Sequence, residues 1–87
     1  GDGLAALKKI RSLRLNETGV NDDSLKLLVT LEKLTRLELR QTMITDASVE
    51  ALSKLRNLQT LDVRETGISA ETAKRLAAAL PSCKVLR

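Results

Sequence analysis

The sequence contains no histidine and a single cysteine, Cys83. A histidine-ligated metal site, a Ser/His/Asp triad, a Cys/His catalytic pair and an internal disulfide are therefore excluded. Neither G-x-G-x-x-G nor G-x-x-x-x-G-K occurs, so no glycine-rich phosphate loop is indicated. Because most familiar enzyme chemistries need one of these features, we expect a protein that is not an enzyme and that holds no cofactor or metal.

Aromatic side chains and long hydrophobic runs are also missing. The 87 residues include no Phe, Trp or Tyr, so the core must be aliphatic, and bases of a single-stranded nucleic acid have no ring to stack on. No apolar run approaches the roughly 18 residues that span a bilayer, and no signal peptide is evident. The formal charge of +4 is spread along the chain. We therefore expect neither membrane insertion nor a nucleic-acid partner.

The chain does contain one segment three times at a fixed spacing. The copies IRSLRLNETGVND, LTRLELRQTMITD and LQTLDVRETGISA begin at residues 10, 34 and 58, which are 24 residues apart. Aliphatic residues recur at matching positions, such as Leu13, Leu37 and Leu61. Repeats of this length are typical of solenoids, in which each unit buries its apolar face on the next. We predict one domain, 1–87, with repeats at 10–33, 34–57 and 58–80.

Each repeat is predicted to hold a short strand followed by a helix. The patterns at 13–15, 37–39 and 61–63 alternate with the period of a strand that has one buried face. Beyond them, apolar residues follow a helical spacing. These residues are Leu25, Leu28 and Leu31, then Val49, Leu52 and Leu55, then Ala73, Leu76 and Ala77. The predicted fold class is α/β, a solenoid with short parallel strands on one face and helices on the other.

Polar residues mark the predicted helix starts. Asn21, Thr45 and Ser69 are candidates for the N-cap position. Acidic residues follow them in the first turn, where the helix dipole favours negative charge. These residues are Asp22, Asp23, Asp46 and Glu71. We interpret these carboxylates as helix-start residues rather than as a metal or acid/base cluster.

The N-terminal end is predicted to begin in the middle of a repeat. Leu4 and Leu7 precede Leu28 and Leu31 by 24 residues, so 1–9 is expected to be the end of a preceding repeat's helix. An apolar edge would then be open beside the first repeat. We expect that this edge allows self-association.

The C-terminal end is predicted to close the array. Pro81 ends the last helix, and 81–87 is expected to be a terminal capping strand that arrives about two residues before a full period. In this register Cys83 takes the buried position of Leu61 and is an inert apolar filler. The chain is therefore expected to be the C-terminal end of a longer array.

The repeated segment resembles the leucine-rich repeat family. Its pattern L-x-x-L-x-L-x-x-N/C-x-L is met by LTRLELRQTMI, with Thr42 at the Asn/Cys position. The T-x-I-T-D sequence of the second repeat is similar to bacterial repeats abundant in planctomycete proteins, although the other repeats read TGVND and TGISA. The resemblance implies a curved stack with its sheet on the concave side, a role in binding another protein, and a bacterial cell-envelope location.

Side chains that flank the inward leucines must point away from the helices, onto what we call the open sheet face, which is the concave face of the family fold. The predicted partner-binding residues on it are Arg14, Asn16, Arg36, Glu38, Arg40, Thr60, Asp62 and Arg64. One column across the sheet is predicted to contain Arg14, Glu38, Asp62 and Lys84, and the next Asn16, Arg40 and Arg64. Neighbouring like charges are unfavourable, so Arg40 and Arg64 suit a carboxylate-bearing or phosphorylated partner.

Other interpretations of the same residues stay open. Glu38, Asp62, Gln41 and Glu65 could neutralise the two arginines in a surface network. A catalytic Glu38–Asp62 pair is not favoured, because the flanking basic residues would keep both carboxylates ionised. Three threonines, Thr18, Thr42 and Thr66, are interpreted as structural, with hydroxyls that satisfy backbone groups of the turn. Gly19 and Gly67 are expected to ease that turn.

The function predicted from the sequence is a non-catalytic protein-interaction module that binds a partner, possibly an acidic one, through the open sheet face. The alternative is a structural segment that braces a larger multidomain protein and has no separable ligand. A third and less favoured candidate is binding of an anionic polymer or nucleic acid, through steeply salt-dependent contacts between its backbone and the basic residues.

Overall fold

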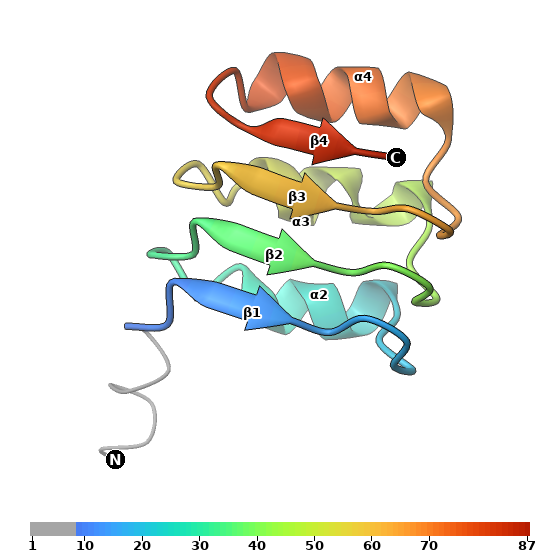
Figure 1. Cartoon of the computed structure of the whole chain (residues 1–87), viewed down its shortest axis with the longest axis horizontal. Coiled ribbons are helices and arrows are strands. Elements are labelled where there is room, and N and C mark those ends of the chain that lie inside the picture. Colours follow the sequence, from blue (N-terminus) through green and yellow to red (C-terminus); the bar gives the residue numbers. More distant parts are fainter. Residues whose placement is uncertain (1–8) are drawn as a thin grey trace.

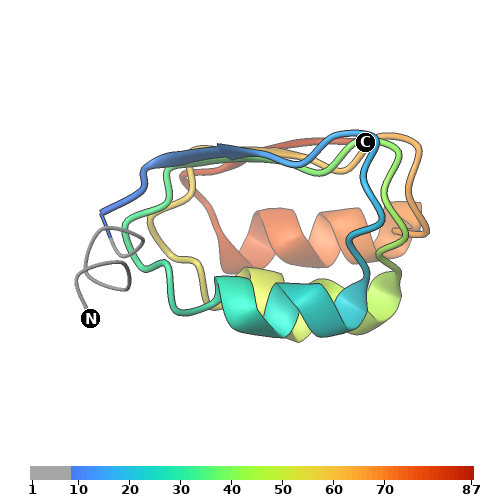
Figure 2. The ribbon, with the colours of Figure 1, turned by 90° about the horizontal axis from the view of Figure 1, so that it is seen from below.

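The computed structural model describes residues 9–87, and the predictions for Leu4 and Leu7 lie outside the described residues. Strands and helices alternate along the chain (Figure 1). In order they are β1 (Ser12–Arg14), α2 (Asp22–Leu28), β2 (Arg36–Glu38), the 3-10 helix η1 (Asp46–Ser48), α3 (Val49–Ser53), β3 (Thr60–Asp62), α4 (Ala70–Ala79) and β4 (Lys84–Leu86). Figure 2 shows the strands in one layer and the helices in a second layer below it, as the sequence predicts.

Four parallel strands form one sheet in the order β1-β2-β3-β4. The register is set by the 24-residue period, so Leu13 lies beside Leu37, and Leu37 beside Leu61. Backbone hydrogen bonds continue past the strand ends, as in the 2.8 Å bond from Leu39 N–H to Asp62 O. Each strand is only three residues long, so its stability depends on its neighbours and on the core below.

The predicted register of the last strand is wrong. Leu61 pairs with Val85 rather than with Cys83, and Lys84 lies beside Thr60 rather than beside Asp62. The full 24-residue period therefore persists into β4, and the neighbour of Asp62 is Leu86.

The error has a physical cause in the segment before β4. Leu80 is buried where the second repeat has Leu55, and the Cys83 N–H donates to Leu80 O as the Leu58 N–H donates to Leu55 O. The stretch up to this buried leucine is therefore one residue longer than in the second repeat, and the link from Cys83 to β4 is one residue shorter than the link from Leu58 to β3. Cys83 therefore fills the buried position of Leu58, and Ala77, which the sequence assigned to the apolar stripe, is exposed.

The core is a continuous layer of aliphatic side chains between the sheet and the helices. In the second repeat Leu34, Leu37 and Leu39 have no solvent exposure. Their equivalents in the first repeat, Ile10, Leu13 and Leu15, are only partly buried, because the first repeat lies at one end of the described stack. Middle layers are covered from both sides, which is how a solenoid of thin repeats excludes water.

Helix starts follow the prediction. The N-cap side chains of Asn21, Thr45 and Ser69 each accept a hydrogen bond from a backbone N–H in the first turn. At Asn21 the cap is reciprocal, since the Ser24 hydroxyl accepts from the Asn21 N–H. These bonds satisfy donors that helix geometry leaves without partners, so short helices can form on a tightly packed surface.

The turn after each strand is held by a threonine hydroxyl. Thr18, Thr42 and Thr66 donate to the carbonyl oxygen three residues earlier, at 2.7, 2.7 and 2.6 Å. This arrangement confirms their structural interpretation. Just before each threonine the chain is left-handed at a residue other than glycine, with φ of 57° at Gln41 and 58° at both Glu17 and Glu65.

The glycines do not provide the left-handed position, because no glycine in the described range has positive φ. Gly67 instead permits a close approach between repeats. A Cβ there would lie 2.9 Å from Ile44 O, whereas a Cβ at Gly19 would meet nothing within 4 Å. Gly19 and Gly67, which the sequence predicted to ease the turn, therefore do not supply the left-handed residue of that turn.

Replacing Thr42 by Val is expected to lower the free energy of unfolding by about 1–3 kcal/mol, because the buried Leu39 carbonyl loses its donor. Thr18→Val is the matched control: its hydroxyl makes the equivalent bond, but the residue is exposed and water can replace it. Urea denaturation measures both variants. An equal decrease in the free energy of unfolding in both variants would contradict our view that burial makes the Thr42 bond more important than the Thr18 bond.

Two substitutions of Gln41, to glycine and to valine, are expected to change the stability of the fold in different directions. Gln41→Gly removes the Cβ that opposes the left-handed conformation, worth about 1–2 kcal/mol, against an entropic cost of about 0.5–1 kcal/mol. Gln41→Val adds a β-branched side chain, which the left-handed region strongly disfavours. Thermal and urea unfolding should show the glycine variant at least as stable as the parent and the valine variant less stable. The reverse order would show that the turn tolerates any side chain.

Candidate partner-binding face

The predicted site residues lie together on the open sheet face, which points away from the helices in Figure 2. The register places Arg14, Glu38 and Asp62 in one column across three strands, as predicted. Arg36 and Thr60 lie side by side in a second column, with Lys84 beyond them. The open sheet face is therefore built from side chains that are far apart in sequence and adjacent in space.

A third column continues beyond the ends of the strands. The Arg40 N–H donates to Asn16 Oδ1 at 2.8 Å, and the Gln41 N–H donates to Arg64 O at 3.1 Å. These bonds hold Asn16, Arg40 and Arg64 in the predicted order. The structure thus brings all eight predicted residues together, while their role in binding stays a prediction.

Glu38 is the first of two carboxylates held beneath arginines. Its side chain is 15% exposed, and its Oε2 lies 3.0 Å from Arg36 Nε and 3.4 Å from Arg14 Nε. Asn16 Nδ2 donates to Oε1 at 2.9 Å. The Asn16 bond, followed by the two arginines, keeps the pKa of Glu38 below its ordinary value despite partial burial. Glu38 therefore stays ionised and fixes the guanidinium groups of two strands.

Asp62 is the second carboxylate and is more deeply buried, with 5% of its side chain exposed. Arg64 grips it with two parallel bonds, Nε to Oδ1 at 3.0 Å and Nη2 to Oδ2 at 2.8 Å, and the Arg64 N–H adds a third at 3.1 Å. These bonds lower the pKa of Asp62 and raise that of Arg64. For Arg64, the structure thus agrees with the alternative interpretation, in which neighbouring carboxylates neutralise the two arginines, and the carboxylate concerned lies two positions earlier on the same segment.

Arg40 differs from the other arginines of this face. It forms no ion pair with any of residues 9–87. Its Nε is shielded from solvent, and within the described part of the chain it has no hydrogen-bond partner. Sequence reasoning identified Arg40 and Arg64 as equivalent, and it missed this difference because the pairing depends on side-chain conformation.

The electrostatic balance of the face is positive. Four arginines and two carboxylates leave a formal excess of two positive charges. The side chains of Arg14, Arg36 and Arg64 are 71%, 53% and 49% exposed, whereas both carboxylates are largely covered. An approaching molecule therefore meets guanidinium groups and not the carboxylates that orient them.

The two carboxylates of the open sheet face are both held in the ionised form. Glu38 and Asp62 both have lowered pKa values, so neither carboxyl is the protonated acid that an acid/base pair requires. In residues 9–87 no group of three or more His, Cys, Asp or Glu side chains could hold a metal ion. Burial raises the pKa of the Cys83 thiol, which confirms that this cysteine is a buried filler.

Two helix-start carboxylates have a role that the sequence analysis missed, because they connect adjacent repeats. Asp22 accepts bonds from the Thr45 N–H at 2.8 Å, the Thr45 hydroxyl at 2.6 Å and the Ser48 hydroxyl. Asp46 likewise accepts from the Ser69 N–H at 2.8 Å. The sequence does contain a sign of these connections, because each acceptor, Asp22 or Asp46, lies 23 residues before its N-cap donor, Thr45 or Ser69.

These connecting bonds also set the ionisation of both carboxylates. Burial acts to raise the pKa of Asp22, but the bonds from Ser48 and Thr45 outweigh it, and the net shift is downward. The bond from the Ser69 N–H is the main cause of the lowered pKa of Asp46. Both groups are therefore ionised at neutral pH, where their bonds to the next repeat are strongest.

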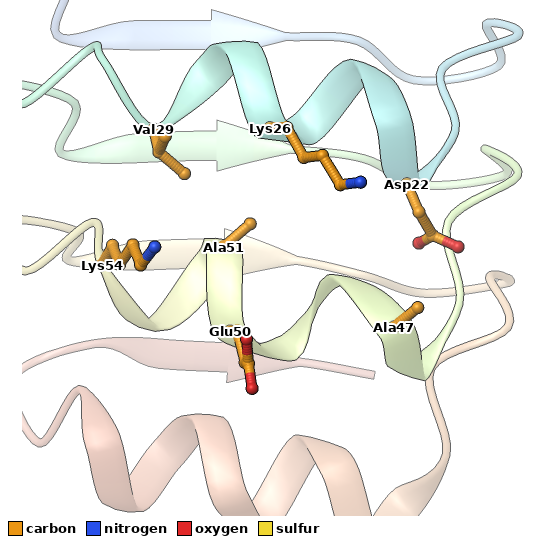
Figure 3. Close-up of a pocket in the computed structure, with 7 residues that line it drawn as sticks. All are labelled: Asp22, Lys26, Val29, Ala47, Glu50, Ala51 and Lys54. Carbon is orange, nitrogen blue, oxygen red and sulfur yellow. The ribbon is translucent and has the colours of Figure 1, made fainter.

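A shallow groove lies between α2 and α3 on the helical side (Figure 3). Ala47 and Ala51 of the later helix segment face it, and Lys26 reaches across it from α2. Glu50 points away from α2, and Asp22 at the groove's end already accepts three hydrogen bonds. The groove follows from small side chains between two helices and offers no converging set of polar groups.

Comparison with known proteins supports a repeat architecture. The family model described as "Leucine Rich repeat" matches residues 30–53 and 54–77, which is more than half of the chain. A leucine-rich repeat protein of Leptospira interrogans has a similar solved structure, with a TM-score of 0.70 and 26% sequence identity. The similarity covers 98% of this chain and 21% of the Leptospira protein, so this chain spans about a fifth of that protein's length. A comparison with curated protein sequences finds no match.

The described part of the chain has no helix long and apolar enough to cross a membrane.

Acidification is expected to destabilise the fold. Asp22, Glu38, Asp46 and Asp62 all have folded-state pKa values below their ordinary ones, so each contributes stability above its unfolded pKa of about 4. That contribution is lost as the pH falls through the lower folded pKa. Urea denaturation between pH 7 and pH 2.5 should show the free energy of unfolding falling below about pH 4.

Asp22→Asn tests the largest of the connecting clusters. At pH 7 this variant should have a lower free energy of unfolding than the parent protein. The difference in free energy should become smaller at low pH, where the carboxylate of the parent is protonated. Asp23→Asn is the matched control, because the Asp23 side chain is 88% exposed and its one ion-pair partner among residues 9–87 is Lys26. A pH-independent difference for Asp22→Asn would show that its charge is unimportant.

Proposed function

Because the chain belongs to the leucine-rich repeat family, whose members generally serve as protein-interaction modules, we propose that it binds a protein partner through the open sheet face. The observation that carries this proposal is the fixed array of arginines. Arg14, Arg36 and Arg64 are half-exposed or more, yet each is oriented by a largely buried carboxylate. Side chains that are already ordered lose less conformational entropy on binding, so more of the contact energy appears as affinity.

We infer further that the partner is acidic where it meets this face. The face carries an excess of positive charge, and the whole chain has a formal charge of +4. Complementary potentials accelerate association and disfavour partners of the wrong sign. Arginine is also the basic residue that interfaces favour, because its planar group forms several directed hydrogen bonds.

The alternative function is that of a structural segment which braces a larger protein. Its support is that the chain matches only 21% of the length of a longer repeat protein. In this case the open sheet face would have no separable ligand. A related use of the first repeat is self-association, because Ile10, Leu13 and Leu15 are partly buried there and Leu27 of α2 is 75% exposed.

Affinity capture with the 87-residue chain as bait is the test of the proposed function. The wild-type chain should retain a protein that Arg40→Glu loses, since the reversal places a negative charge on the open sheet face. Arg56→Glu is the matched control, because it makes the same change at an exposed residue in the loop before β3. Arg64 is left unchanged in this design, because its loss would leave the buried Asp62 carboxylate without its bonds.

Three outcomes separate the candidates. Retention by wild type and Arg56→Glu, with loss in Arg40→Glu and an unchanged circular dichroism spectrum, supports binding at the open sheet face. Equal retention by both variants contradicts it. Capture of no protein by a folded, monomeric wild-type chain supports the bracing alternative, and light scattering establishes whether self-association has covered the bait.

A further inference from the structure

We propose that Arg40 recognises a side-chain carboxylate of the partner, so that the open sheet face binds an Asp- or Glu-containing segment. This inference rests on the proposed function and names the chemistry of its partner. It follows from how the other arginines of the face are engaged, from the absence of an ion pair between Arg40 and any of residues 9–87, and from the fixed charges around Arg40.

The other arginines of the face are committed within the protein. Arg36 and Arg14 direct their Nε atoms at Oε2 of Glu38, and Arg64 uses Nε and Nη2 on Asp62. Each of these guanidinium groups is therefore already paired with a carboxylate of this face. A partner carboxylate can also contact these arginines, but it would have to compete with Glu38 and Asp62 for their N–H donors.

Arg40 has the opposite status. Its side chain is half-buried, and among residues 9–87 it has no ion pair and no hydrogen-bond partner for its shielded Nε. A guanidinium has five N–H donors and no acceptor, and no carboxylate of residues 9–87 forms an ion pair with the four donors that the Nη atoms of Arg40 carry. The side chain is therefore poised to gain from an acceptor that arrives from outside.

The backbone of Arg40 is also fixed in place. Its N–H donates to Asn16 Oδ1 at 2.8 Å, and its carbonyl accepts from the Glu17 N–H at 2.8 Å. Both bonds tie Arg40 to the preceding repeat. A side chain that starts from an immobile backbone can be reached without reordering the sheet, which favours recognition by a preformed surface.

The surrounding charges favour a carboxylate over a phosphate. Asp62 lies close enough to interact electrostatically with Arg40, and Glu38 is two residues away along the same segment. A phosphate monoester carries about −1.5 to −2 charges at pH 7, and it would meet both fixed carboxylates. A singly charged carboxylate experiences weaker repulsion from Glu38 and Asp62 than a phosphate does.

The test is a titration of the 15N-labelled 87-residue chain, followed through its arginine Nε–Hε signals. The probes are a glutamate-rich peptide, its glutamine-substituted counterpart and inorganic phosphate, all at one ionic strength. We expect the Arg40 signal to shift saturably with the glutamate peptide only, and to shift more than the Arg36 and Arg64 signals. Binding should weaken about tenfold or more in Arg40→Gln, while Arg56→Gln should leave it unchanged.

Arg40→Lys separates charge from geometry. It keeps the positive charge but loses the planar fork, so it should bind the glutamate peptide more weakly than the wild type. Unshifted Arg40 signals, or unchanged peptide binding in Arg40→Gln, would overturn the inference. A larger shift with phosphate than with the glutamate peptide would also overturn it.

The two proposals fail in different ways. If a captured protein is lost in Arg40→Glu but the glutamate peptide does not shift the Arg40 signal, the open sheet face binds a partner whose chemistry is not acidic. If the peptide shifts the Arg40 signal and no protein is captured, the carboxylate site exists and the proposed function fails.

Discussion

Each repeat of this protein depends on its neighbours, because no repeat can bury its own apolar face. A strand of three residues and a helix of one to three turns are too short to be stable in isolation. Stacking at a period of 24 residues supplies a partner for every ladder bond and closes the aliphatic layer between sheet and helices. All other features of the structure follow from that register, including which side chains meet on the open sheet face.

The same register that closes the core also organises charge. Parallel strands about 4.8 Å apart place equivalent residues of successive repeats in columns, so Arg14, Glu38 and Asp62 become neighbours although 24 residues separate each pair. The carboxylates lie low in this array and the guanidinium groups extend above them. The face therefore presents mainly its positive groups to solvent, although it also contains two carboxylates. Small changes in which residue occupies a column position would change what the face can bind without changing the core.

Sequence periodicity predicted most of the fold because it reports on a repeated packing requirement. The strands, the helix starts, the threonine turns and the columns of the first three strands all follow from the 24-residue spacing. The last strand was misplaced because a longer helix and a shorter link compensate for each other, and local apolar patterns at Cys83 and Val85 fit either register.

The side-chain pairing within the site was harder to predict. Arg40 and Arg64 occupy equivalent positions, yet only Arg64 turns back onto a carboxylate, and such choices depend on rotamers that a sequence pattern does not encode. The left-handed residues were missed for a related reason. Glycine is the usual sign of that conformation, and here the positions hold Glu17, Gln41 and Glu65.

The carboxylates that connect successive helix starts give the stack a polarity. The connections run from donors at the N-cap or in the first turns of one repeat to an acceptor in the first turn of the repeat before it, so they all point in the same direction along the stack. The series stops at the third full repeat, where Ala70 stands at the position of Asp22 and Asp46. The polar links between the helices therefore have a direction. The start of α4 donates a hydrogen bond to the repeat before it through Ser69, but Ala70 offers no carboxylate to a following repeat.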